Sequence, residues 1–176
     1  MEQKQYEFLL KEAAPRVLIE ALKLYGTKEN KGASLSNPEI LSWAKELGLT
    51  KIYTNDAVAW CGLFIAYVVK KSGYEPVKDP LWARNWSNFG TKQKVAMLGD
   101  ILVFKRDTGG HVGIYVGEDD SCYHVLAGNQ SDMVNVTRIL KSRCIGINRC
   151  KWKIAQPSNV RVIHLKANGQ ISNNEA

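Results

Sequence analysis

The chain has few of the residues that build metal centres or disulfide frameworks. Its 176 residues include four cysteines and three histidines, and no two cysteines have CxxC spacing. Because no local pair of ligands has metal-site spacing, we expect no metal and no cofactor. Cys144 and Cys150 are six residues apart on one expected strand, which is too far along it for a disulfide. We therefore expect reduced thiols, three of them structural and one reactive.

Long apolar segments are also missing. The longest apolar runs, such as residues 63–69, are far too short to cross a bilayer. Residues 1–5 are polar, and no apolar stretch with a small-residue cleavage site follows them. We expect neither membrane insertion nor a signal peptide, so that export would need another route.

Acidic residues are outnumbered, and the net charge of +7 with a pI near 9.2 favours anionic partners. Nucleic acid and the bacterial wall are both anionic. The basic residues are scattered, however, and the sequence has neither a basic helix nor a basic strand with interleaved aromatics. Binding to nucleic acid is therefore not expected.

The first half of the chain has helical periodicity. Helices are expected from Pro15 to Tyr25, from the Asn37-Pro38 start to Leu47, and from Cys61 to the Ser72-Gly73 end. A further short helix is expected over residues 81–89, with Trp82 and Trp86 on one face. Core packing and a substrate-binding wall are equally good interpretations of that pair.

From Leu98 the pattern changes to short, β-branched or aromatic segments separated by polar or glycine turns. Consecutive short turns predict antiparallel neighbours, and hence a meander or small barrel of five to six strands with the helices packed on one side, an α+β fold. Strands are expected over residues 101–105, 111–116, 122–127, 133–139 and 144–148.

One domain is expected over residues 1–155. Residues 156–176 are expected to be a C-terminal extension that is partly disordered. Within it, residues 160–165 could form a hairpin that turns through Asn168-Gly169, and residues 172–176 are polar.

The segment DAVAWCGLF contains the best candidate for a reactive group. It places Cys61 in the first turn of an amphipathic helix, where unpaired N–H groups and the helix dipole favour a thiolate and should lower the thiol pKa. His111 follows two glycines at the start of an expected strand. A cysteine on a helix and a distant histidine on a strand are the arrangement that a cysteine nucleophile requires.

Five motifs in a fixed order carry a resemblance to a known superfamily. They are WCGLF, ARNWSNFG, LGDILVF, GGHVGIYVGED and VLAGNQSD, within about residues 17–150. Their order resembles the NlpC/P60 and CHAP superfamily of papain-like cysteine peptidases and amidases that cleave peptidoglycan. The segment from Ala21 to Ile40 also resembles a small phage and bacterial group within it. The resemblance implies a papain-like fold.

Carried over to this chain, the resemblance makes Cys61 the nucleophile and His111 the general base. The third residue is Asn129 by comparison with CHAP-like members, or His124 by comparison with NlpC/P60 members. If Asn129 lies opposite His111, antiparallel pairing places His124 opposite Val116, on the far side of the pleat. We therefore prefer Asn129 and keep His124 as the alternative.

Other residues near these motifs have candidate roles in binding or packing. Trp60, Trp82, Trp86 and Gly110 are the candidate substrate-binding residues, although Trp60 could instead hold the helix start and Gly110 could belong only to a hairpin turn. Asp100 and Tyr53 are expected to be structural, and His164 to lie on the surface.

The resemblance implies a peptidoglycan hydrolase, either an endopeptidase or an N-acetylmuramoyl-L-alanine amidase, that acts through a thioacyl intermediate. The alternatives are a non-catalytic wall-binding or phage-structural module and an acyl or isopeptide hydrolase with another substrate. Such an enzyme would stay in the cytoplasm until a holin released it, or a phage or secretion system would deliver it to the periplasm or wall. A holin or an immunity protein would then be its further partner.

Overall fold

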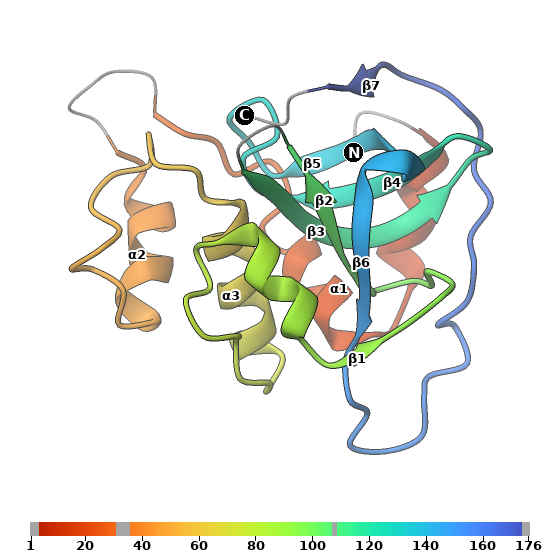
Figure 1. Cartoon of the computed structure of the whole chain (residues 1–176), viewed down its shortest axis with the longest axis horizontal. Helices are drawn as coiled ribbons and strands as arrows, with labels where there is room; N and C mark the ends of the chain where they lie inside the picture. Colours follow the sequence, from red (N-terminus) through yellow and green to blue (C-terminus); the bar gives the residue numbers. More distant parts are fainter. Residues whose placement is uncertain (1–3, 31–35, 107–108, 174–176) are drawn as a thin grey trace.

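The computed structural model describes residues 4–30, 36–106 and 109–173. They form an α+β fold in which helices pack on one face of a seven-stranded mixed sheet (Figure 1). The helices are η1 (Lys4–Lys11), α1 (Arg16–Leu22), α2 (Pro38–Glu46), α3 (Cys61–Lys71), η2 (Ala83–Asn88) and η3 (Lys141–Arg143). The strands are β1 (Thr91–Lys92), β2 (Ile101–Lys105), β3 (Gly110–Glu118), β4 (Cys122–Ala127), β5 (Asn135–Leu140), β6 (Cys144–Arg149) and β7 (Ile171–Ser172).

The helix boundaries follow local sequence signals and confirm the expected starts. The Asn37 side chain accepts a hydrogen bond of 2.8 Å from the Glu39 N–H, and proline occupies the first helical position of α2. Helix α3 ends at Gly73, whose φ of 83° suits glycine. Almost every residue of α3 is buried, because α1, α2, β3 and β4 all pack against it.

The sheet confirms the predicted antiparallel meander for its central strands but not the predicted pairing of the last strand of the meander. Strands β2, β3, β4 and β5 pair antiparallel in chain order. Strand β6 was expected beside β5 and instead pairs with β2, so the order is β1-β6-β2-β3-β4-β5-β7. In a flat sheet β6 and β5 would be about 19 Å apart, whereas the four steps from Leu140 to Cys144 span at most about 14 Å. The open sheet must therefore be strongly curved.

The expected C-terminal extension is part of the fold. Ile163 and Leu165 pair with Glu118 at the end of β3, and Val160 is buried. Strand β7 then adds parallel to β5, which makes the sheet mixed, and the C-terminal segment runs along the outside of the sheet in Figure 1. The predicted hairpin does not form, because Ile163 and Leu165 bond to β3. The predicted disorder is wrong for Ser172, because this residue pairs with β5. Residues 174–176 lie outside the described ranges.

Two apolar clusters fill the two faces of the curved sheet. The larger cluster joins the helices to Ile101, Val103, Val112 and Ile114, and the smaller one lies inside the curve. The smaller cluster contains Ala96, Leu102, Phe104, Tyr115, Val125, Ala127 and Ile139. Gly113 lies in this layer without space for a side chain, since a Cβ built on it would be 2.4 Å from Val125 Cγ1 and 2.8 Å from Ala127 Cβ.

We expect Gly113→Ala to lower the free energy of unfolding by about 1–3 kcal/mol, because an added methyl group overpacks this layer. Urea denaturation measures the loss. The matched control is Gly109→Ala, since a Cβ on Gly109 meets no atom within 4 Å. Equal stability of the two variants would contradict this account of the sheet interior.

Candidate functional site

The candidate nucleophile lies where helix α3 meets strand β3. Cys61 is the first residue of α3, and its side chain is buried with 3% exposure. The backbone N–H groups of Cys61, Gly62 and Val112 face its sulfur. Because Val112 follows His111 directly in β3, the thiol lies beside the start of the strand that carries the candidate base. The fold therefore brings the Cys61 sulfur to the backbone next to His111, which is 50 positions further along the chain.

Burial raises the pKa of the Cys61 thiol, although the N–H groups of Val112 and Gly62 and the charge of Arg106 oppose the shift. The sequence-based expectation of a lowered pKa is thus wrong. A helix N-terminus stabilises a thiolate, but removal of the sulfur from water costs the charged form more here. A raised thiol pKa favours the neutral form of Cys61, which needs a base to remove its proton.

Alkylation of Cys61 by iodoacetamide should therefore be slow at pH 7 and should accelerate as the pH rises above the ordinary thiol range. Peptide mapping by mass spectrometry separates Cys61 from the other three cysteines. Arg106→Gln should move the profile to still higher pH, because the Arg106 charge lowers the pKa of Cys61. A rate that is already maximal at pH 7 would contradict the neutral thiol.

The candidate base is held by a glutamine. The Nε2 atom of His111 lies 3.1 Å from Oε1 of Gln130, and both side chains are fully buried. Gln130 cannot turn its amide over, because its Nε2 donates to the backbone oxygen of Asn135 at 2.7 Å and its Oε1 accepts from the Thr137 hydroxyl at 2.7 Å. Oε1 must therefore accept from His111, so Nε2 of His111 carries the hydrogen and Nδ1 is the basic nitrogen of the neutral ring.

Asn129, the expected third residue, does not fill that role. Among the described residues its side chain makes no hydrogen bond with His111, and its backbone is left-handed with φ 58°. The expected register is correct as far as Ile114 opposite Leu126, but β4 ends at Ala127. Beyond that point the chain turns, so strand parity no longer decides which side chain faces the histidine. The residue of the GNQ motif that contacts His111 is Gln130, which follows the predicted Asn129.

The loop around Gln130 has an unusual backbone. Asn129, Ser131 and Asp132 all have positive φ, between 51° and 61°. Each such conformation costs a non-glycine residue of order 1–3 kcal/mol, and strain of this kind clusters at functional sites. Val134 and Asp132 hydrogen-bond to the backbone of residues 26–29, which holds the loop in place.

His124, the alternative third residue, belongs to a different cluster. Its Nδ1 lies 2.7 Å from the Tyr6 hydroxyl, and its Nε2 lies 3.0 Å from an Asp119 oxygen, so both ring nitrogens are already bonded. A bulge at Val116 pairs His124 with Gly117 and not, as expected, with Val116. The cluster ties helix η1 to the sheet.

Of the candidate substrate-binding tryptophans, only Trp82 can contact a ligand. Trp82 is 70% exposed, whereas Trp60 and Trp86 are fully buried. The expected shared face is wrong, because the helical turn begins only at Ala83 and leaves Trp82 in an extended conformation. Trp60 precedes Cys61 and donates a hydrogen bond to Glu29, which supports its role at the helix start.

The segment that carries Trp82 passes directly over the first turn of α3. A Cβ on Gly62 would be 2.4 Å from the Pro80 oxygen and 2.7 Å from the Leu81 oxygen. Gly110 is similarly enclosed, since a Cβ on it would be 2.9 Å from the Arg84 side chain. The segment from Pro80 to Arg84, which carries the exposed Trp82, therefore packs against both the first turn of α3 and the start of β3.

The remaining predictions concern structural residues. Asp100 accepts hydrogen bonds of 2.8 Å from Nε and Nη2 of Arg149, and Tyr53 is buried with its hydroxyl toward the Val58 oxygen, so both are structural as predicted. His164 is exposed, also as predicted. Among the described residues, no cluster of three histidine, cysteine or acidic side chains could hold a metal ion.

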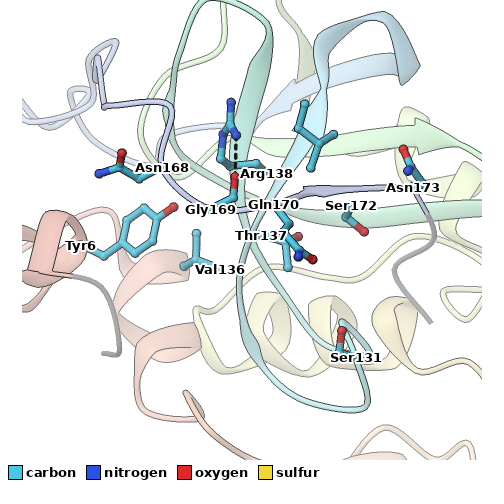
Figure 2. A pocket seen from close by; sticks show the side chains of 11 residues that line it. Tyr6, Ser131, Val136, Thr137, Arg138, Asn168, Gly169, Gln170, Ser172 and Asn173 are labelled. Atoms are coloured by element: carbon cyan, nitrogen blue, oxygen red, sulfur yellow. Dashed lines mark hydrogen bonds between the residues drawn. The ribbon is translucent and has the colours of Figure 1, made fainter.

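A cavity of about 380 Å³ lies on the other side of Thr137, between β5 and the C-terminal segment. Figure 2 shows the hydrogen bond of 2.8 Å from Arg138 to the Gly169 oxygen that ties this segment to β5. Because Thr137 lines the cavity and also donates to Gln130, the C-terminal segment and the candidate site share one wall.

Neither a protein family nor a curated protein matches the chain. None of the helices within the described ranges has both the length and the apolar character needed to span a membrane.

Proposed function

We propose that the chain is a papain-like cysteine hydrolase that cleaves an amide bond of bacterial peptidoglycan through Cys61, His111 and Gln130. The carrying observation is a cysteine at a helix start whose sulfur faces the backbone N–H of Val112, the residue after a buried histidine that is bonded through Nε2 to a locked glutamine oxygen. A nucleophile, a base and a residue that orients the base are the parts of a catalytic triad.

The chemistry follows from these positions. Nδ1 of His111 removes the thiol proton as the Cys61 sulfur attacks the amide carbonyl carbon, and a tetrahedral oxyanion forms. Backbone N–H groups at the start of α3 stabilise this charge. The C–N bond then breaks, and His111 returns the proton to the leaving amine. Water, activated by the same histidine, hydrolyses the thioester and restores the thiol.

Three features support a wall substrate. The ordered sequence motifs resemble wall hydrolases, the net charge of +7 favours an anionic polymer, and Trp82 is exposed on the segment that passes over the first turn of α3. Both an endopeptidase and an N-acetylmuramoyl-L-alanine amidase fit these features. The same proposal includes the route to the wall: a holin releases the protein, or a phage or secretion system delivers it. A holin or an immunity protein would then be its further partner.

The wild-type protein should reduce the turbidity of purified sacculi, and Cys61→Ala should abolish that loss because it removes the nucleophile. Mass spectrometry of the released muropeptides identifies which amide bond is cleaved. Cys61→Ala must keep the wild-type melting temperature for the comparison to hold. Equal turbidity loss with both proteins would end the proposal.

The buried, neutral thiol favours one other candidate, a module that binds the wall without cleaving it. Such a module would sediment with sacculi and release no fragments, whereas the hydrolase should do both. The same digestion therefore separates the two functions.

A further inference from the structure

A second cavity, of about 300 Å³, lies at the outer edge of strand β6. Its walls combine a buried amide, Asn148, with Ser87, Lys92 and the apolar Ile145. On its inner side β6 pairs with β2, but on its outer side β1 and the following Gln93 bond only to residues 147–149. No described strand pairs with the outer edge of residues 144–146, so this part of the sheet can accept another extended chain.

Asn148 is the unusual member of this cavity. It is fully buried, and within the described part of the chain no residue hydrogen-bonds to its Nδ2 or its Oδ1. A buried carboxamide without partners costs stability, since both of its polar atoms lose water. Such a residue is explained if a ligand supplies the missing partners.

The amide of Asn148 lies near a second polar side chain, that of Ser87. Asn148 Nδ2 and Ser87 Oγ would each be 3.1 Å from a Cβ built on Gly146, so both groups lie close to this glycine. The amide and the hydroxyl can donate hydrogen bonds to a bound chain, and Oδ1 of Asn148 can accept one. A donor and an acceptor side by side match a peptide group.

The charge of the cavity selects an acidic peptide. No aspartate or glutamate lines it, and Lys92 is exposed without an ion pair to any described residue. The second lysine, Lys141, is paired with Glu118 at 2.8 Å. Ile145, which is 49% exposed, offers an apolar contact beside the open edge.

We propose that this cavity binds an extended, carboxylate-bearing peptide, which is the stem peptide of peptidoglycan if the proposed function holds. Asn148 and Ser87 bind a backbone peptide group, and Lys92 binds a carboxylate. This subsite is distinct from the cysteine site, so one wall strand could be held at β6 while another is cleaved at Cys61.

The test uses ¹⁵N-labelled full-length Cys61→Ala protein, which cannot turn over the ligand, and the synthetic peptide L-Ala-γ-D-Glu-L-Lys-D-Ala. The side-chain amide resonances of Asn148 should shift in an NMR titration. Asn148→Leu should weaken binding by roughly tenfold or more through the loss of two hydrogen bonds. Gly146→Ala should weaken binding similarly, because the added methyl group would crowd Asn148 Nδ2 and Ser87 Oγ. Lys92→Gln should weaken binding of the free acid more than that of the C-terminally amidated peptide.

Stability distinguishes a ligand-binding Asn148 from a structural one. Asn148→Leu should keep or raise the melting temperature, because it removes an unpaired buried amide. A lower melting temperature with unchanged peptide affinity, or shifts confined to residues around position 61, would overturn the subsite. Cleavage of sacculi by the wild type without binding at β6 would refute the subsite alone. Binding at β6 without cleavage would refute the hydrolase and leave the subsite.

Discussion

Gln130→Leu should slow the cleavage of sacculi by roughly 10²–10⁴-fold, in proportion to the losses seen when the orienting residue of a triad is changed. The amide oxygen at 3.1 Å is the group that keeps the hydrogen of His111 on Nε2. Without it the neutral ring can place the hydrogen on Nδ1, and the nitrogen that should deprotonate Cys61 is then no longer basic. Initial rates of dye release from labelled sacculi measure the effect.

The matched control is Asn129→Gly, which removes the neighbouring amide and tolerates the left-handed backbone at φ 58°. It should keep most of the activity. The ¹⁵N shifts of the His111 ring give a readout that simple loss of stability would not change, since they report Nε2–H in the wild type and a mixture of tautomers in Gln130→Leu. If Asn129→Gly loses as much activity as Gln130→Leu, the assignment of the third residue to Gln130 is wrong.

Asp119→Ala should lower the free energy of unfolding by about 3–5 kcal/mol, the usual result when one partner of a buried ion pair is removed. The Asp119 carboxylate lies 2.7 Å from Nε of Arg138 and also bonds to His124, and both charged side chains are almost fully buried. The substitution leaves the guanidinium without its counter-charge. Urea denaturation at pH 7 measures the loss.

The matched surface variant is Glu46→Ala, which breaks an ion pair of 3.2 Å with Lys71. Both of those side chains are about half exposed, so the stability should change little. A similar loss of unfolding free energy in the two variants would show that burial does not determine how much the Asp119–Arg138 ion pair contributes to stability.

The same cluster predicts how stability depends on pH. Burial opposes the charge on Asp119, but bonds from Arg138, Ser121 and His124 outweigh it and hold the pKa of Asp119 well below its usual range. Burial also lowers the pKa of His124, which Asp119 only partly offsets. Both groups bind protons more tightly in the unfolded chain than in the folded protein. Their unfolded pKa values are about 6.5 for His124 and about 3.9 for Asp119. The stability that each group contributes is therefore complete above its unfolded pKa and is lost as the pH falls below it.

Wild-type stability should therefore decrease below about pH 6.5 and again below about pH 4. Asp119→Ala should lack the second decrease. Urea denaturation at pH 7, 5 and 3 tests both steps. Stability that rises on acidification through this range would contradict the assigned directions.

Local elements could be predicted from the sequence because their signals are local. Strands β2 and β4 have the expected bounds, and the Asn37 cap and the Gly73 end are where expected. The partner of β6 could not be predicted, because it depends on how strongly the whole sheet curves. The prediction that Trp82 and Trp86 share a helix face was wrong for a local reason. The helical turn starts at Ala83, one residue after Trp82, so the i, i+4 rule does not apply to this pair.

In the candidate site, too, features with local signals could be predicted and features that depend on tertiary contacts could not. The cysteine at a helix start and the histidine at a strand start could be identified from neighbouring residues, and in the structure the Cys61 sulfur faces the backbone N–H of Val112, the residue after His111. The thiol pKa had the wrong expected direction, because the dipole is a local effect, whereas desolvation depends on the layers that close over the sulfur. The amide of Asn148, without a partner among the described residues, has no sequence signal at all.

By itself, the sequence determined most of the longer helices and strands and the two candidate residues Cys61 and His111, since short-range periodicity, capping and turn chemistry are local signals. Only the tertiary structure decided that Gln130 and not Asn129 holds His111, that Cys61 rests as a neutral thiol, and that the C-terminal segment completes the sheet. Each of these depends on contacts between residues far apart in the chain and on burial, which a pattern along the chain does not contain.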